Sequence, residues 1–401
     1  MFKSDTYCDI IYTDETMREG MQIEDADIPV EQKIALLDAL SETGLDRIMV
    51  GSFVSAKYTP QMRRIEEIVT GFRPNPSVTY SALALNQRGV ERAEEFTPPL
   101  SDERARRRPR LYCHMCDVFV RRNANRSQAD EMAQWPAIVE KARAAGVKEA
   151  TIGINAAFGS NFIGDIPVDV GMRMLALQHA HWDAAGIPVR QLLLSDPMGW
   201  CHPVKVTDYL TRIKKQWPHI ADFGLHVHNT RGMAMTSIYA ALTVLGRDDV
   251  LRLEGTVGGI GGCPYCGNGV ATNMAPTEDL VHMLEGMGYT TGVRLDKLIE
   301  CNLMLERMIG RQTLSHVPKT GPRPTDPKDF YDPDAPFVET MAHAQHFRLG
   351  PSAYEGALRP WKDRITSLYR DRIDRGLPAY DDEFPWNEPW VPQPSVPAMA
   401  R

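Results

Sequence analysis

The sequence of 401 residues has no long apolar run and no excess of positive charge. Nowhere does it approach the roughly 18 uninterrupted apolar residues of a membrane-spanning helix, and residues 1–9 are too polar for the core of a signal peptide. Its 45 lysines and arginines are outnumbered by 52 aspartates and glutamates, which gives a formal net charge of −7. These absences argue against a membrane or nucleic-acid partner, and they predict a cytoplasmic protein that binds a small molecule.

Cysteine is scarce as well. The seven cysteines are odd in number and scattered, which argues against the paired framework of a small secreted disulfide protein and predicts reduced thiols. Hydrophobic residues, in contrast, make up 43% of the chain, which is enough to fill a sizeable core without cross-links.

Short β-branched or apolar runs alternate with stretches of helical period, the pattern of parallel strands joined by covering helices. The segment Val30–Thr43 illustrates the helical period, because Ile34, Leu37 and Leu40 recur at three-residue spacing and Gly44 provides a stop. We count eight candidate strands: Cys8–Thr13, Asp46–Gly51, Val78–Leu83, Arg110–Cys116, Glu149–Asn155, Val189–Ser195, Asp222–His228 and Val250–Thr256.

Eight such units predict a (β/α)8 TIM barrel, an α/β fold of about 250 residues whose chemistry lies on the loops after the C-terminal ends of its strands. The alternative is a doubly wound open sheet, but no G-x-G-x-x-G fingerprint follows the first strand. We therefore expect a catalytic TIM-barrel domain over residues 1–310.

Two segments exceed a minimal barrel. Residues 311–401 form a C-terminal extension that is rich in proline and too aromatic for a plain disordered tail, and we expect it to wrap the barrel or a partner subunit, with a helix near Trp361–Arg375. The segment Phe96–Arg110 is interpreted either as an exposed insertion or as a phosphate anchor for an acyl-coenzyme A. It contains a run of arginines: Arg104, Arg106, Arg107 and Arg108.

Residue types that suit chemistry stand at the predicted ends of two strands. The first strand runs into Arg18 and Glu19, which either are exposed or face a metal and an anionic substrate, because buried charge is costly unless it is paired or liganded. The seventh strand ends in His226 and His228. Since side chains alternate along a strand, these two imidazoles lie on one face about 7 Å apart, close enough to share one metal ion.

The loop after the eighth strand, Gly258–Gly269, is rich in glycine and predicts a mobile segment that closes over a site. It includes Cys263 and Cys266 in a Cys-x-x-Cys arrangement. The setting is neither a thioredoxin-like unit nor one half of a zinc site, so a single cysteine acting as an acid or base is favoured over dithiol redox chemistry.

Taken together, these features resemble the TIM-barrel metallolyases that include hydroxymethylglutaryl-CoA lyase, homocitrate synthase and isopropylmalate synthase. The lyase is the most similar of the three. The similarity runs over about residues 10–310 and rests on five blocks in the family's order: Arg18–Gln22, Gly51–Met62, Leu225–His228, Gly261–Tyr265 and Thr277–Gly286.

The resemblance implies a divalent-metal site and a set of residue roles. Oxygen and imidazole ligands suit Mg²⁺ or Mn²⁺, with Zn²⁺ or Co²⁺ as alternatives. The implied metal ligands are Glu19, His226 and His228, with Asn268 or Asn273 as a further one; the implied catalytic residues are Arg18 for the enolate oxygen, Asp196 near the substrate hydroxyl and Cys263 for proton transfer at the product carbon; the implied substrate-binding residues are Gln22 and Ser52.

One position departs from the family, which has a glutamate where this chain has Met49. Methionine can neither take a proton nor orient an arginine, so we interpret Met49 as a core residue of the second strand. The expected function is metal-dependent cleavage of a 3-hydroxy acyl compound, a small hydroxy acid or an acyl-CoA, by a homo-oligomer such as a dimer or tetramer. The alternatives are an acyl-CoA condensing synthase, favoured by Glu19 and Asn229, and a metabolite-binding barrel that has lost activity, favoured by Met49.

Overall fold

The structure is a computed structural model that describes residues 1–101, 108–267, 271–337, 352 and 354–381. The chain divides into two compact units, Met1–Pro318 and Lys319–Arg401, and each is described by itself. No helix in the described part of the chain is long and apolar enough to cross a membrane.

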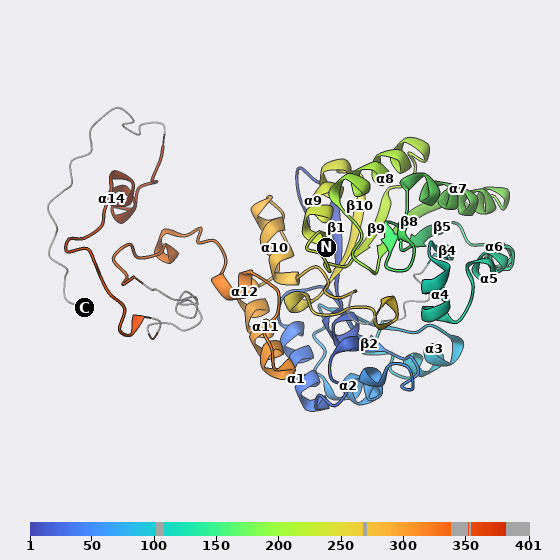
Figure 1. Ribbon diagram of the computed structural model, residues 1–401, viewed down its shortest axis with the longest axis horizontal. Coiled ribbons are helices and arrows are strands. Elements are labelled where there is room, and N and C mark those ends of the chain that lie inside the picture. The colour runs from blue at the N-terminus through green and yellow to red at the C-terminus, as the bar shows by residue number, and fades with distance from the viewer. Residues whose placement is uncertain (102–107, 268–270, 338–351, 353, 382–401) are drawn as a thin grey trace. The chain divides into compact units, whose positions relative to one another are not determined.

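The first unit is a (β/α)8 barrel, as the sequence predicted, with an all-parallel sheet at its centre and helices around it (Figure 1). Its strand order is β3-β2-β1-β10-β9-β8-β5-β4. The eight strands match the eight predicted segments to within two residues: β1 Asp9–Asp14, β2 Arg47–Ser52, β3 Thr79–Leu83, β4 Arg110–His114, β5 Ala150–Asn155, β8 Val189–Asp196, β9 Asp222–Val227 and β10 Val250–Gly255. A separate antiparallel pair, β6 Gly159–Ser160 and β7 Gly164–Asp165, follows β5.

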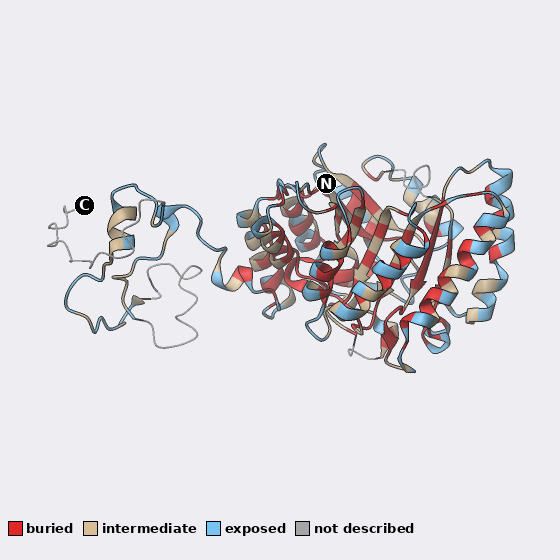
Figure 2. Cartoon of the chain, turned by 90° about the horizontal axis from the view of Figure 1, so that it is seen from above, coloured by how far each residue is buried: buried red, intermediate tan, exposed pale blue. Residues whose placement is uncertain are grey.

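Helices cover the sheet and bury their apolar sides against it, so that the strands are largely buried and the helices are exposed on their outer sides (Figure 2). The predicted helix after the first strand is present as α1, and it ends before Gly44, whose φ of +84° favours glycine. A Cβ at Gly44 would lie 2.4 Å from the carbonyl oxygen of Gly292, so no other residue fits there. The helices of this unit are α1 Val30–Ser41, α2 Ile65–Gly71, α3 Gln87–Glu94, α4 Asp117–Ala124, α5 Gln128–Ala133, α6 Trp135–Ala144, α7 Val168–Ala184, α8 Pro203–Gln216, α9 Ala234–Val244, α10 Thr277–Gly286, α11 Leu295–Ile309 and α12 Val317–Thr320.

The barrel has a seam between β3 and β4. Among the described residues, no ladder of backbone hydrogen bonds joins these two strands. Instead, Leu100 and Ser101 lie along the edge of β3, and the backbone N–H of Ser101 donates to the carbonyl of Tyr80 at 2.8 Å. At the edge of β4, the backbone N–H of His114 donates to the side chain of Glu131 at 2.9 Å. Side chains and a loop therefore take the place of strand pairing along this edge.

The interior of the barrel is not completely filled. A cavity of about 170 Å³ lies between β1, β2, β3 and β10, and half-buried Met49 is one of its walls. Our interpretation of Met49 as a core residue is therefore only half right: it belongs to the second strand, but it faces the barrel interior rather than the apolar layer between sheet and helices. The other lining residues are mostly polar or charged: Ile11, Thr13, Arg47, Thr79, Ser81, Arg252, Leu253 and Glu254.

The arginine-rich segment is described only at its end. Arg104, Arg106 and Arg107 lie outside the described residues. Arg108 forms ion pairs with Glu149 at 2.8 Å and with Asp222 at 3.0 Å. Glu149 and Asp222 lie at the amino ends of β5 and β9. Arg108 therefore lies at the end of the barrel opposite the predicted catalytic end.

In the second unit, helix α14 Leu368–Asp374 lies within the predicted helical range, and a short 3-10 turn spans Pro327–Asp329. Arg364 and Arg370 both pair with Asp374 there. That this extension wraps the barrel or a partner subunit stays a prediction from the sequence.

Glu278 ties α10 to the loop after β10. Its wholly buried carboxyl group accepts the backbone N–H of Gly258, with both oxygens 3.0 Å away, and burial raises the pKa of Glu278 to about 8. Between its ordinary pKa of 4.5 and about 8, the folded protein keeps this proton while the unfolded chain has lost it. The free energy of unfolding should therefore fall as the pH rises through this window.

A Glu278→Gln variant keeps a similar shape but has no proton to lose. We expect the midpoint temperature of unfolding of this variant to equal that of the wild type at about pH 5 and to exceed it at about pH 8.5. Thermal unfolding in the presence of a chelator measures both midpoint temperatures. Glu300→Gln, at an exposed carboxylate on α11, should keep the wild-type slope. Parallel pH dependences of wild type and Glu278→Gln would refute this account.

Candidate metal and catalytic site

A short π-helical turn, Thr16–Gly20, follows β1 and places Arg18 and Glu19 at the C-terminal end of the barrel. Such wide turns are uncommon and often mark functional sites. The turn is fixed by Thr16, whose backbone N–H donates to Asp14 Oδ1 at 3.0 Å and whose hydroxyl accepts the backbone N–H of Val257 at 2.8 Å. The two charged residues that follow are therefore held in place rather than free in a loop.

Glu19, His226 and His228 come together at this end of the barrel. One potential ligand atom from each lies within 4.8 Å of the other two. His228 Nε2 is 3.5 Å from Glu19 Oε1, and the two imidazole rings are 5.2 Å apart. Neither ring nitrogen of the buried His228 has a hydrogen-bond partner among the described residues, and a buried polar atom left without a partner is costly. One carboxylate and two imidazoles around such an unpartnered ring fit a divalent cation.

The electrostatics of the two histidines differ. Burial, together with the charges of His226 and Arg18, holds the pKa of His228 well below its usual range, so its ring is neutral, the form that binds a metal. Burial also opposes protonation of His226, but the carboxylate of Glu254 outweighs it and raises the pKa of His226 to about 9.

Glu254 was not predicted from the sequence. It stands in β10, contacts His226 Nδ1, and so directs the other ring nitrogen toward Glu19 and His228. A carboxylate behind a metal-binding histidine is a common way to fix its orientation. The signal in the sequence was a carboxylate inside a predicted strand, because a carboxylate there needs a partner.

A Glu254→Gln variant should bind the divalent cation about 10–100-fold more weakly, because an amide holds the imidazole of His226 less firmly than a carboxylate does. Titration with Mn²⁺, followed by electron paramagnetic resonance, measures this change. Glu149→Gln, at the opposite end of the barrel, is the matched control. Unchanged Mn²⁺ affinity in Glu254→Gln would remove Glu254 from the metal centre.

Arg18 lies between two carboxylates. Its Nη1 donates to Glu15 Oε2 at 2.8 Å and also contacts Glu19 Oε2. Glu15 is buried, and although burial and the nearby Glu254 raise its pKa to about 7, Arg18 opposes that rise. The two carboxylates therefore orient the guanidinium of Arg18 beside the cluster of Glu19, His226 and His228. Glu15 was not predicted from the sequence, where it is one acidic residue among several in a charged run.

Gln22 connects the cluster to the loop that carries Cys263. Its side-chain amide donates to Glu19 Oε1 at 2.6 Å and to the carbonyl of Gly262 at 2.9 Å. Cys263 is half-buried and unoxidised, and its backbone N–H donates to Ala271 at 2.9 Å. Cys266 is fully buried, and burial raises the pKa of its thiol. Cys263 is therefore the thiol of this pair that a substrate could reach.

Not every predicted residue meets the cluster. Asp196 is fully buried, and its oxygens accept the backbone N–H groups of Trp200 at 2.9 Å and Cys201 at 2.7 Å, so it shapes the loop after β8. Ser52 is buried at the end of β2. Asn273, with φ +64°, is hydrogen-bonded through its backbone to Gly261 and Asn229. It thus lies between the segments bearing Glu19 and His228, whereas Asn268 lies outside the described residues.

Known proteins match most of the chain. A family model described as HMGL-like matches residues 9–305. The mitochondrial hydroxymethylglutaryl-CoA lyase of Rattus norvegicus is 31% identical over 301 residues, which cover 75% of this chain and 86% of the rat protein. The hydroxymethylglutaryl-CoA lyase YngG of Bacillus subtilis is 30% identical over 294 residues, or 73% of this chain and 91% of that protein.

A solved structure gives the same picture. An HMG-CoA lyase from Acinetobacter baumannii, in complex with coenzyme A and 3-methylmalate, is similar with a TM-score of 0.63 and 30% identity. The match covers 80% of this chain and 97% of that one.

A further relative by sequence is the 3-hydroxy-3-isohexenylglutaryl-CoA/hydroxymethylglutaryl-CoA lyase from Pseudomonas aeruginosa. It is 31% identical over 303 residues, which cover 75% of this chain and 93% of that protein.

Proposed function

The chain belongs to the HMGL-like family and is a carbon–carbon lyase of the HMG-CoA lyase type, and on that premise we propose that it cleaves a 3-hydroxy acyl-CoA with the help of a divalent cation. The observation that carries this proposal is the cluster of Glu19, His226 and His228, with the buried ring of His228 left without a hydrogen-bond partner among the described residues.

The cation would be held by Glu19, His226 and His228, with Asn273 as the described candidate for a further ligand. One carboxylate and two imidazoles suit Mg²⁺ or Mn²⁺, and Zn²⁺ or Co²⁺ are the alternatives. When bound, a divalent cation supplies a Lewis acid that lowers the pKa of the substrate's hydroxyl group and offsets developing negative charge.

The residues around the cluster suit a retro-Claisen cleavage. The substrate hydroxyl loses its proton and becomes a carbonyl, the adjacent carbon–carbon bond breaks, and the electron pair leaves with the acyl fragment as an enolate. Arg18, oriented by Glu15, would place its guanidinium opposite the enolate oxygen. The thiol of Cys263 would give a proton to the enolate carbon.

The thioester part of the substrate is supported by the relatives. The Acinetobacter baumannii lyase structure contains coenzyme A, and the Rattus norvegicus and Pseudomonas aeruginosa proteins are named for acyl-CoA substrates. The acyl chain, and the dimer or tetramer that we expected from the sequence, remain part of the proposal; sedimentation velocity would test the oligomer.

The decisive experiment offers the metal-loaded protein a panel of 3-hydroxy-3-methyl acyl-CoAs and the matching free hydroxy acids, with cleavage products followed by mass spectrometry. We expect cleavage of at least one thioester into a free acid and a shorter acyl-CoA. If the protein binds metal yet turns over no member of the panel, the lyase proposal fails and a metabolite-binding role gains support.

A further inference from the structure

The cavity inside the barrel lies beside the metal cluster. Glu254 belongs to both, because it lines the cavity and contacts His226 Nδ1. In the sheet register Glu254 pairs with Thr13 of β1, and the register of β1 and β2 sets Arg47 beside Thr13. Two strand steps of about 4.8 Å therefore separate Glu254 from Arg47 along the barrel wall. Both side chains line the cavity, which connects the neighbourhood of the cluster with Arg47.

The cavity is confined to one side of the interior because side chains fill the other side. Leu193 of β8 packs on two glycines, since a Cβ at Gly224 would lie 2.3 Å from its Cδ2 and a Cβ at Gly153 would lie 2.9 Å from its Cβ. Tyr112 of β4 packs on Gly153 as well, and its hydroxyl lies 2.8 Å from Ser195 Oγ. Space is thus left only beside β1, β2, β3 and β10, among the residues that the structure describes.

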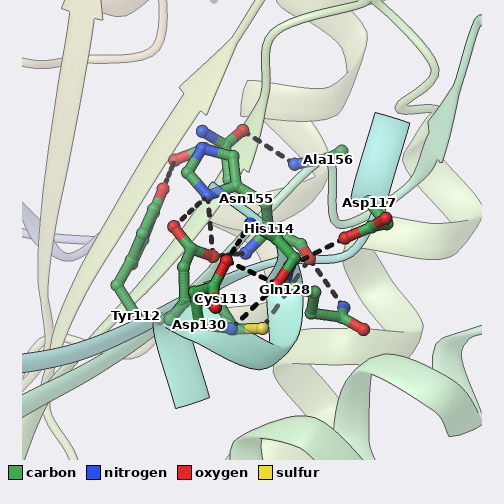
Figure 3. A network of polar contacts seen from close by, with 12 residues as sticks. Tyr112, Cys113, His114, Asp117, Gln128, Asp130, Asn155 and Ala156 are labelled. Atoms are coloured by element: carbon green, nitrogen blue, oxygen red, sulfur yellow. Dashed lines mark hydrogen bonds and ion pairs between the residues drawn. The ribbon is translucent and has the colours of Figure 1, made fainter. Parts of the chain in front are cut away.

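The polar side chains at the end of β4 hold one another in place. Figure 3 shows this network, in which Asn155 accepts the backbone N–H of Ala156 at 2.7 Å and Gln128 donates to the carbonyl of His114 at 2.7 Å. His114 Nδ1 lies 2.9 and 3.1 Å from the two oxygens of Glu131, on helix α5, whose first turn is fixed by a capping box. The filled side of the barrel is therefore held together by its own polar contacts.

Arg47 differs from the other charged residues that line the cavity. Arg252 donates from Nε and Nη2 to the two oxygens of Asp222 at 2.7 and 3.0 Å, and Glu254 is held by a histidine of the cluster. The half-buried guanidinium of Arg47 has no hydrogen-bond or ion-pair partner within the described part of the chain. The next inward residue of β2, Met49, has no charge to offer it. Because a charge withdrawn from water without a partner is costly, this position suits an anionic ligand.

The setting favours a carboxylate on a short branch. A guanidinium donates two parallel hydrogen bonds, which match the oxygens of a carboxylate or a phosphate. The cavity of about 170 Å³ is smaller than the roughly 300–1,000 Å³ of pockets that enclose a whole ligand, so it takes only part of a substrate. The phosphates of coenzyme A lie far along the chain from the thioester, whereas the cavity adjoins the groups that would hold the reacting hydroxyl. A carboxylate close to the reacting carbon therefore fits better than a phosphate.

We propose that this cavity is a subsite for an acidic branch on C3 of the substrate, and that Arg47 is the specificity-determining residue that binds the carboxylate of this branch; this rests on the proposed lyase function. The 3-hydroxyl group would lie at the cluster of Glu19, His226 and His228, and the branch would extend from C3 into the cavity toward β2. The substrate is then a coenzyme A thioester of a dicarboxylic 3-hydroxy acid.

The test compares two thioesters that differ only at the end of this branch: 3-hydroxy-3-methylglutaryl-CoA and the analogue in which an amide replaces the free carboxylate. For the full-length, metal-loaded wild type, kcat/KM for the acid should exceed that for the amide by at least about 10-fold. Arg47→Gln should lower kcat/KM for the acid by about 10–100-fold, mostly through KM, and leave that for the amide within about 3-fold. Arg47→Lys, which keeps the charge but not the paired donors, should recover part of the loss.

Two sets of variants serve as controls. Met49→Glu adds a carboxylate on the same face of β2 as Arg47, so it should lower kcat/KM for the acid more than for the amide, whereas Met49→Gln should affect both substrates alike. Arg190→Gln controls for the loss of an arginine, because Arg190 of β8 donates to the carbonyl of His219 and does not line the cavity. It should keep the wild-type kinetics. Melting temperature and bound metal, measured for every variant, separate loss of recognition from loss of fold or cation.

The outcomes decide the proposal in either direction. A wild type without preference for the acid, or an Arg47→Gln variant that cleaves the acid within about 3-fold of the wild-type kcat/KM, would overturn it while leaving the lyase proposal intact. If the wild type cleaves neither thioester, isothermal titration calorimetry with Mg²⁺ and 3-hydroxy-3-methylglutarate takes the place of kinetics. Binding that is at least about 10-fold weaker in Arg47→Gln than in the wild type supports the subsite independently of the reaction. Equal affinity of the two proteins, or no binding to the wild type, overturns it.

Discussion

Replacing His226 or Glu19 by alanine should abolish stoichiometric binding of the divalent cation. Each change removes one of three protein ligand groups that lie within 4.8 Å of one another, which leaves too few donors for a stable site. The loss of affinity should exceed the roughly 10–100-fold that loss of a supporting group such as Glu254 would cause. Inductively coupled plasma mass spectrometry of the dialysed proteins measures the metal content directly.

The control for these variants is His219→Ala, because His219 precedes β9 at the end of that strand opposite His226. It should keep the metal content of the wild type. Full metal occupancy in both His226→Ala and Glu19→Ala would refute the ligand assignment, whatever their activity.

Replacing Cys263 by serine should separate chemistry from metal binding. A serine hydroxyl is a much weaker acid than a thiol, so kcat should fall by about 10²–10⁴-fold if Cys263 supplies a proton. The metal content should stay the same, because none of the three clustered ligand groups belongs to Cys263. Single-turnover kinetics with a substrate that the wild type cleaves, together with the metal content, test both statements.

Cys266→Ala is the matched control for Cys263→Ser, because Cys266 is a thiol in the same loop but is fully buried. It should turn over at nearly the rate of the wild type once its folding has been confirmed. Undiminished turnover by Cys263→Ser would show that another group protonates the product carbon.

The strands and the histidine pair could be predicted because their information is local. Period-two patterns define a strand, and the same alternation puts His226 and His228 on one face. The loop after β10 was predicted to be mobile, yet in its described residues Arg122 donates to the carbonyl of Tyr265 and Asn161 to that of Cys266. Glycine there provides unusual backbone angles, such as φ +120° at Gly261, as well as freedom of movement.

The supporting residues could not be predicted because they act across the barrel. Nothing in the spacing of His226 and Glu254, or of His114 and Glu131, relates them before the strands are in register and the capped helix α5 is in place. Met49 was misjudged for a similar reason, since a strand pattern gives alternation but does not say which of the two sides is the barrel interior.

The seam between β3 and β4 has a consequence for local opening of the barrel. An amide hydrogen paired within a ladder exchanges with solvent only when two strands part, whereas the amide of His114 is released when the Glu131 side chain changes rotamer. Hydrogen exchange at the end of β4 should therefore proceed by small fluctuations that leave β8 and β9 closed. Because the same carboxylate also holds the His114 ring, each such fluctuation frees the imidazole as well. Protection of one backbone amide thus reports how long the ring remains oriented.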